Sequence, residues 1–395
     1  MDEKKSSLFS LLSHAEKSNE KVDMAYLYGE VLTRKSNALK KPLAAQLELL
    51  PLCNFRCGFC YIQMSPEELR ASGHRMLRFA DWQWYVDEIC KLGVSSMTFT
   101  GGECTIHPDF LQLYEYAYNK GLQVGMISNG SMITDEILQL FERCPPSKIY
   151  ITLYGMSKET YARNCGNGAA FDAVMQNLDA LLERKFTVIL NYTAGKENLC
   201  DLEAALAYAR ERKISILPTS ALNIQNKCDQ AVLDAQLADY YEYQKIEHQH
   251  LSILRGKSLD EFEKGYFSSF SDPIPSESKQ GLSCNAGRCS FTVNWKGEMK
   301  SCANFDLFTV DPRKTGMQAA WEQLVAWADQ VPILEECETC IFQQKCRRCV
   351  AIHYGDMGEF GKVSPRFCFK KLYPEQAAKM QAKYDEMKAN GEIEE

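Results

Sequence analysis

The first half of the chain alternates short apolar runs with longer stretches of helical period. Between residues 44 and 220, amphipathic stretches with apolar residues at i, i+3, i+4 and i+7 separate runs of strand length. The expected strands are residues 44–50, 95–100, 122–128, 148–154, 186–192 and 214–220. This alternation predicts an α/β fold, a partial (β/α)6 TIM-type barrel of parallel strands. Functional residues of such barrels gather at the carboxyl ends of the strands.

The pattern changes after residue 222. A polar helix is expected within residues 230–264, a Ser/Pro-rich linker follows at residues 268–281, and cysteine-rich loops come next. The predicted division is an N-terminal helical segment (1–42), the barrel (43–222), a helical connector and linker (223–281), a small cysteine-rich domain (282–375) and a C-terminal charged helix (376–395).

The composition is that of a soluble globular protein, with 45% hydrophobic and 25% charged residues. No run approaches the roughly 20 apolar residues of a bilayer span, and the N-terminus has no signal-peptide cleavage pattern. A cytoplasmic protein without a membrane partner is therefore expected. The net charge of -7 argues against nucleic acid as a partner.

Seventeen cysteines are many for a cytoplasmic chain of 395 residues, and they indicate metal or redox chemistry rather than disulfides. Eleven of them fall into two groups. The others are scattered, and scattered cysteines are mostly small buried hydrophobic residues: Cys90, Cys104, Cys144, Cys165, Cys200 and Cys228.

Cys53, Cys57 and Cys60 form the first group, with C-x3-C-x2-C spacing directly after the first expected strand. Three thiolates can bind three irons of a [4Fe-4S] cluster and leave the fourth iron open. A zinc ion would need a fourth ligand, and no further Cys or His lies nearby in the sequence. Zinc is the alternative to the cluster.

These cysteines, together with Phe59, resemble the cluster motif of the radical S-adenosylmethionine (SAM) superfamily. The resemblance implies that SAM chelates the open iron through its amino and carboxylate groups. One electron from the cluster then breaks a sulfur–carbon bond, and the released 5'-deoxyadenosyl radical takes a hydrogen atom from the substrate. Phe59 is implied as a cofactor contact.

Gly101, Gly102 and Glu103 resemble the GGE motif of the same superfamily. The glycines are expected to let the backbone approach the ligand, and the carboxylate to accept a hydrogen bond from the SAM ammonium. Cys104 follows where relatives commonly carry proline, and a packed thiol is the favoured reading. Further SAM contacts are implied at later strand ends and nearby: Ser128, Asn129, Thr152, Arg163 and Asn191. Taken alone, Asn129 also fits a turn and Arg163 a solvated helix position.

The second group has eight cysteines, enough for two further [4Fe-4S] clusters. Its spacing resembles the SPASM extension of radical SAM enzymes that modify peptides and proteins. The resemblance implies an inner auxiliary cluster held by Cys284, Cys289, Cys302 and Cys349, and an outer one held by Cys337, Cys340, Cys346 and Cys368. Cys346-x2-Cys349 is one residue shorter than the common spacing, which puts the Cys349 assignment in doubt. A pair of zinc ribbons is the alternative.

The resemblance implies a maturase that oxidises or crosslinks a ribosomally made peptide, for example through a thioether. Alternatives are the anaerobic sulfatase-maturating type that forms formylglycine, a small-molecule or tetrapyrrole oxidase, and an iron-sulfur electron carrier. Asp306 is a candidate base, and Cys165 and Cys104 are candidate hydrogen donors.

The implied partners are a peptide or protein substrate and a flavodoxin or ferredoxin-type electron donor. The segment before residue 44 is too short for a winged-helix leader-binding domain. Leader recognition is therefore expected to use a separate protein, the N-terminal helix or the surface near residues 230–265.

Overall fold

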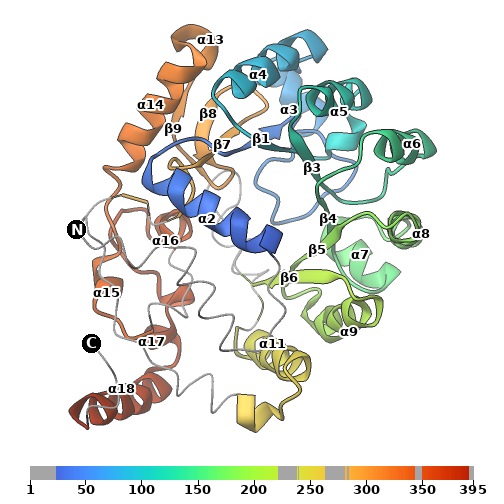
Figure 1. Cartoon of the computed structure of the whole chain (residues 1–395). Coiled ribbons are helices and arrows are strands. Elements are labelled where there is room, and N and C mark those ends of the chain that lie inside the picture. The colour runs from blue at the N-terminus through green and yellow to red at the C-terminus, as the bar shows by residue number, and fades with distance from the viewer. Residues whose placement is uncertain are drawn as a thin grey trace.

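The computed structural model describes residues 24–220, 238, 240–262, 281–282, 284–342 and 349–390. Within these residues one sheet runs in the order β6-β5-β4-β3-β2-β1-β7-β8-β9 (Figure 1). The strands are β1 (Ala44–Glu48), β2 (Ser96–Thr100), β3 (Gln123–Ser128), β4 (Ile149–Leu153), β5 (Val188–Thr193), β6 (Ser215–Thr219), β7 (Ser290–Val293), β8 (Met299–Cys302) and β9 (Phe305–Val310).

The six strands expected from the apolar runs are β1 to β6, and each boundary lies within two residues of the expected one. They pair in parallel, in chain order, with helices between them. The partial barrel is therefore confirmed. The helices of this half are α2 (Met24–Ala38), α3 (Pro66–Ala71), α4 (Phe79–Lys91), α5 (Phe110–Asn119), α6 (Asp135–Arg143), α7 (Lys158–Cys165), α8 (Ala170–Glu183) and α9 (Leu202–Arg212), with short 3-10 turns η2 (Cys104–Ile106) and η3 (Leu199–Asp201).

The alternation of side chains along each strand explains how the sheet is covered. In β4, Ile149 and Ile151 are buried, whereas Tyr150 and Thr152 between them are only half-buried. Successive residues of a strand point to opposite faces, so one face joins the helices in the core and the other lines the inside of the barrel. Each large aliphatic side chain buried in this way contributes about 1.5–3 kcal/mol to folding.

The sheet continues into the cysteine-rich part of the chain. β7 pairs in parallel with β1, with Ala44 opposite Ser290, and β8 and β9 follow antiparallel. The barrel sheet thus extends past residue 282, where a separate domain is expected to begin. The other described helices are α11 (Tyr240–Leu254), α13 (Pro312–Thr315), α14 (Met317–Ala328), α15 (Glu335–Glu338), α16 (Val350–Met357), α17 (Phe369–Leu372) and α18 (Pro374–Ala389), with the turn η4 (Pro365–Phe367).

The segment after α2 ties the start of the barrel to the cysteine-rich part. Asn37 Nδ2 donates to the Cys284 carbonyl at 3.2 Å, and Trp321 Nε1 donates to the Lys40 carbonyl at 3.1 Å. Lys40 also forms an ion pair with Asp329. Among the described helices, none combines the length and the apolar character needed to cross a membrane.

Candidate functional site

Cys53, Cys57 and Cys60 lie on the loop that follows β1, at the carboxyl edge of the parallel strands. All three side chains are half-buried. The loop folds back on itself, because the Met64 N–H donates to the Pro51 carbonyl at 2.9 Å and the Cys60 N–H to the Cys57 carbonyl at 3.1 Å. The three thiols lie within electrostatic reach of one another. We call residues 51–64 the cysteine loop.

Backbone N–H groups point at two of the sulfurs. The Phe55 N–H donates to Cys53 Sγ and the Gln63 N–H to Cys60 Sγ, each at 3.3 Å. Burial raises the pKa of Cys53 to about 12 and the pKa of Cys57 well above its usual value, so a thiolate here needs a cation beside it. A metal cluster supplies that charge, and N–H donors to sulfur are a common feature of iron-sulfur sites. The donor set therefore fits the expected cluster.

In the described residues, no set of three or more His, Cys, Asp or Glu side chains is arranged to converge on a single metal ion. A [4Fe-4S] cluster binds each thiolate to a different iron, so its ligands need not meet at one point. The ligand assignments of the cysteine loop remain predictions.

The glycines of the GGE motif pack against the cysteine loop and the residues just before it. A Cβ added at Gly102 would lie 2.1 Å from the Leu52 carbonyl oxygen, and one at Gly101 would lie 2.5 Å from that of Leu50. The Gly102 N–H also donates to the Leu50 carbonyl at 2.8 Å. The sequence predicts that these glycines let the backbone approach a bound ligand. In the structure, the close approach is to the backbone that carries the cysteines.

Glu103 is fully buried and joins the ends of β2 and β3. Its carboxylate accepts hydrogen bonds from the Thr105 N–H (3.1 Å) and hydroxyl (2.6 Å), the Ser128 hydroxyl (2.9 Å) and the Asn129 N–H (2.7 Å). Burial raises the pKa of Glu103, and these donors oppose that effect. The carboxylate thus has a structural role, and its contact with the SAM ammonium stays a prediction.

Asn129 connects the end of β3 to the cysteine loop. Its Nδ2 donates to Asn54 Oδ1 at 2.8 Å and lies 3.8 Å from Cys53 Sγ. Ser128 turns its hydroxyl toward Glu103 and accepts from the Gly130 N–H at 2.9 Å. Sequence reasoning missed Asn54. Its place directly after the first cysteine is the only signal that could have indicated it.

The other expected SAM contacts are distributed around the same edge. Thr152 and Asn191 are direct neighbours in the register of β4 and β5, and both are half-buried. Phe59 is half-buried on the cysteine loop. Arg163 instead makes an ion pair with Glu197 at 3.2 Å, with about half of its side chain exposed. The structure therefore places Thr152 beside Asn191, whereas Arg163 is paired with Glu197 at the surface.

Comparison with known protein families matches residues 47–209 to the Radical SAM superfamily. This part of the chain is a radical SAM domain. The match runs from β1 to α9, and so it contains the cysteine loop, the GGE motif and all the strand ends described above.

Two relatives that match most of the chain have low sequence identity to it. AlbA, the antilisterial bacteriocin subtilosin biosynthesis protein of Bacillus subtilis, is 24% identical over 279 residues, which cover 70% of this chain and 58% of AlbA. An AdoMet-dependent heme synthase of Methanosarcina barkeri is 22% identical over 336 residues, 80% of this chain and 94% of the synthase. Streptococcus suis SuiB bound to precursor peptide SuiA has the same fold, with a TM-score of 0.58 and 14% identity, over 86% of this chain and 83% of SuiB.

Two cysteines inside the radical SAM domain were candidate hydrogen donors. Cys104 is fully buried, and its Sγ donates to the Ile127 carbonyl at 3.4 Å. Cys165 is also buried, and its Sγ donates to the Tyr161 carbonyl at 3.1 Å. Burial raises the pKa of Cys104 well above its usual value and that of Cys165 to about 11. Both positions suit packed thiols.

Beyond the radical SAM domain, the structure brings several of the remaining cysteines together. Cys284, Cys302 and Cys349 lie within electrostatic reach of one another, and Cys289 lies within reach of Cys284. Burial raises the pKa of Cys284 and raises that of Cys302 to about 12. This is the set expected for the inner cluster. It includes the residue whose assignment the shortened spacing put in doubt.

The set expected for the outer cluster is only partly described. Cys337 and Cys368 pack against one hydrophobic cluster, and Cys340 packs against a neighbouring one. Cys346 lies outside the described residues.

Asp306, the candidate base, takes part in an ion-pair group that the sequence did not predict. Lys300 in β8 is 2% exposed, and its Nζ lies 2.7 Å from Asp306 Oδ1 and 3.4 Å from Glu48 Oε1. Glu48 stands at the end of β1 and is 1% exposed. The group therefore connects the radical SAM domain to the cysteine-rich part through charged side chains.

Proposed function

We propose that this protein is a radical SAM peptide maturase that removes hydrogen from a ribosomally made peptide and leaves it oxidised or crosslinked. The observation that carries the proposal is the cysteine loop, which presents three half-buried thiols at the carboxyl edge of a radical SAM domain. The names of AlbA, a bacteriocin biosynthesis protein, and of SuiB with its precursor peptide support a peptide as substrate. A thioether or another crosslink is the expected product.

The chain's own residues have distinct roles in this proposal. Cys53, Cys57 and Cys60 hold the cluster, and the backbone packing of Gly102 keeps the cysteine loop in place. The proposed SAM contacts are Phe59, Glu103, Ser128, Asn129, Thr152, Arg163 and Asn191. When bound, the cluster and SAM supply the 5'-deoxyadenosyl radical through one-electron reductive cleavage.

Oxidation of the peptide requires an electron acceptor besides SAM, because the substrate radical has to lose one further electron. Hydrogen-atom abstraction yields 5'-deoxyadenosine and a substrate radical, which then loses one electron and one proton as the new bond forms. The peptide loses two hydrogens in total. In our proposal, the cluster that accepts this electron would be held by Cys284, Cys289, Cys302 and Cys349. A second cluster, which would be held by Cys337, Cys340, Cys346 and Cys368, would pass the electron to the SAM cluster or to the external electron carrier. A flavodoxin or ferredoxin-type protein would supply the first electron.

The test begins with the anaerobically reconstituted protein. We expect about twelve irons per chain for three clusters and 5'-deoxyadenosine on addition of SAM and dithionite. Peptides encoded beside the gene should then lose two hydrogens by mass spectrometry. Cys53→Ala should abolish 5'-deoxyadenosine formation, while Cys200→Ala, which removes an exposed thiol outside both groups, should leave it unchanged. Retained SAM cleavage in Cys53→Ala would overturn the assignment.

A tetrapyrrole substrate is the second candidate, because the heme synthase of M. barkeri is matched over 94% of its length. Incubation with an iron coproporphyrin distinguishes the two functions. Modification of the porphyrin without modification of any peptide would favour the second candidate. A protein substrate in which Cys or Ser becomes formylglycine would give its own mass change.

A further inference from the structure

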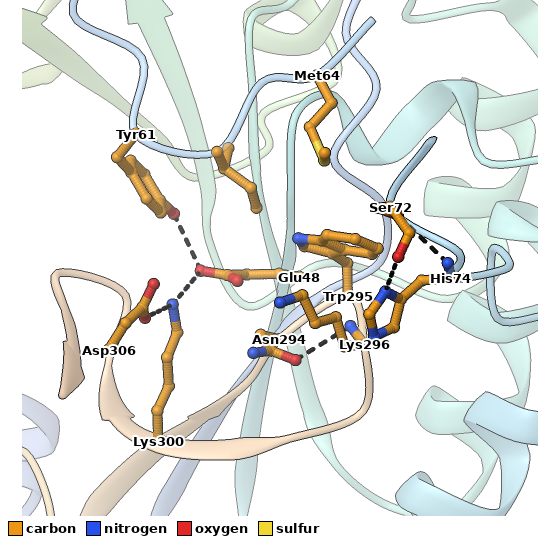
Figure 2. A pocket seen from close by; sticks show the side chains of 11 residues that line it. Glu48, Tyr61, Met64, Ser72, His74, Asn294, Trp295, Lys296, Lys300 and Asp306 are labelled. Atoms are coloured by element: carbon orange, nitrogen blue, oxygen red, sulfur yellow. Dashed lines mark hydrogen bonds and ion pairs between the residues drawn. The ribbon is translucent and has the colours of Figure 1, made fainter. Parts of the chain in front are cut away.

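A cavity of about 310 Å³ lies between the cysteine loop and the turn that joins β7 to β8 (Figure 2). Tyr61, directly after Cys60, lines it on one side, and Trp295 and Lys296 line it from the turn. Glu48, Lys300 and Asp306 stand together at one end (Figure 2). The cavity is therefore flanked by the loop of the first cysteine group and by the strand that ends at Cys302.

The donors at this end of the cavity are already used. Lys300 Nζ donates to Asp306 Oδ1 at 2.7 Å and to the Ala303 carbonyl at 3.1 Å, and it forms an ion pair with Glu48 Oε1 at 3.4 Å. The Tyr61 hydroxyl donates to Glu48 Oε1 at 3.2 Å. A ligand that needs donors finds none of these available.

Hydrogen-bond acceptors, in contrast, are still available to a ligand. The second carboxylate oxygens of Glu48 and Asp306 make no hydrogen bond to any residue that the structure describes. When both acids are ionised, two carboxylates around one lysine leave a net negative charge, and Glu48, at 1% exposed, carries its charge where a missing partner is costly. Lys296 also lines the cavity, but among the described residues the ion pairs of Glu48 and Asp306 are with Lys300 and not with Lys296, whose ammonium lies 5.4 Å from the Trp295 ring centre. The cavity thus favours a cationic group that donates hydrogen bonds.

The rest of the lining suits a long side chain with an apolar stem. Ile62 and Trp295 are buried, and Met64 is half-buried beside them. Lysine and arginine combine an apolar stem with a cationic tip, and the net charge of -7 favours the approach of a basic segment.

We propose that this cavity binds a lysine or arginine side chain of the substrate peptide, with the carboxylates of Glu48 and Asp306 as its acceptors. The peptide as source of that side chain rests on the proposed function; the recognition of a basic side chain rests on the cavity. Binding there holds the peptide between the cysteine loop and Cys302. Glu48 and Asp306 are then residues that determine specificity.

Equilibrium dialysis of the anaerobically reconstituted protein tests this without turnover. The probes are the N-acetyl amides of arginine, lysine and norleucine, the last having an apolar side chain without charge. We expect the two basic probes to bind and the norleucine probe not to bind. Equal binding of all three would overturn the proposal. Saturating SAM should leave binding unchanged, and displacement by SAM would show that the cavity belongs to the SAM pocket instead.

Two variants locate the binding. Glu48→Gln and Asp306→Asn should each weaken binding of the basic probes by about tenfold or more, as loss of one partner of a close charge pair does. Glu67→Gln is the matched control, because Glu67 is an exposed acid on α3 outside the cavity, and it should bind as the unaltered protein does. Unchanged binding in both cavity variants would overturn the proposal. Circular dichroism shows whether each variant is folded. If Glu48→Gln does not fold, Asp306→Asn still tests the proposal, because Asp306 is the more exposed of the two acids.

These results are separate from those of the proposed function. A protein that binds basic probes but forms no 5'-deoxyadenosine would contradict the proposed function alone. A protein that modifies peptides, with Glu48→Gln indistinguishable in its KM for a peptide with a basic residue, would contradict this inference alone.

Discussion

Gly102, two residues after β2, packs directly against the backbone of the cysteine loop. Any side chain there places its Cβ 2.1 Å from the Leu52 carbonyl oxygen, and that atom belongs to backbone that cannot rotate away. Gly102→Ala should therefore lower the free energy of unfolding by about 1–3 kcal/mol, the usual cost of overpacking. Urea denaturation of the metal-free protein measures this.

Gly29→Ala is the control for that substitution. Gly29 lies inside α2 with no atom within 4 Å of an added Cβ, and its backbone needs no glycine-specific conformation. Alanine is the better helix former by about 1 kcal/mol, so this variant should be as stable as the unaltered protein or slightly more stable. A similar loss in both variants would refute the packing argument.

Glu48 makes stability depend on pH in a defined direction. Burial raises the pKa of Glu48 from 4.5 to about 7, against the opposing effect of Lys300. The folded state then holds this proton more tightly than the unfolded state does. The stabilisation by Glu48 is therefore present below about pH 4.5 and is lost as the pH rises to about 7.

Glu48→Gln removes that dependence because glutamine does not ionise. Between pH 5 and pH 7, the free energy of unfolding of Glu48→Gln should rise relative to that of the unaltered protein, by at most about 1.4 kcal/mol per pH unit. Denaturant titrations of both proteins at the two pH values measure the difference, and other titrating groups cancel in the comparison. A difference that stays constant with pH would contradict the prediction.

The turn between β7 and β8 is held to the barrel by a contact with α4. The Tyr85 hydroxyl donates to the Gly297 carbonyl at 2.8 Å, and Gly297 has a φ of +88°, where a side chain would be strained and would meet the Tyr85 ring. Tyr85→Phe should lower the free energy of unfolding by about 1 kcal/mol, the net value of one such hydrogen bond. Thermal or urea denaturation measures it.

Tyr150→Phe provides the comparison for that hydrogen bond. Tyr150 is half-buried in β4, and its hydroxyl makes no hydrogen bond to the residues that the structure describes. Its loss should change stability by less than the loss at Tyr85. If Tyr150→Phe were the more damaging of the two, the turn would not depend on the Tyr85 contact.

The elements differ in how readily the sequence reveals them. β1 to β6 were predictable because each is an apolar run between amphipathic helices. β7 and β8 have only four residues each, and β8 contains Lys300, a residue type that propensity places at the surface. Lys300 is buried because Glu48 and Asp306 surround its ammonium, and those partners lie on other elements. No local pattern records that arrangement.

For the molecule as a whole, the two cysteine groups should be separable in function. Cys337→Ala should lower the iron content from about twelve to about eight per chain, retain part of the 5'-deoxyadenosine formation and stop formation of the peptide product. Iron analysis and mass spectrometry measure these effects, with Cys200→Ala as the control. Full product formation by Cys337→Ala would refute the electron-relay role of the second group.

The radical SAM domain can be predicted from the sequence, because its strands, cysteine spacing and strand-end motifs are local patterns of neighbouring residues. Tertiary structure alone decided three things: that β7 adds to β1, that Gly102 packs against the cysteine loop, and that Glu48 and Lys300 share a buried ion pair beside a cavity. Each depends on atoms that are distant in sequence. Pairing, packing and charge compensation act through space, and so they appear only once the chain has folded.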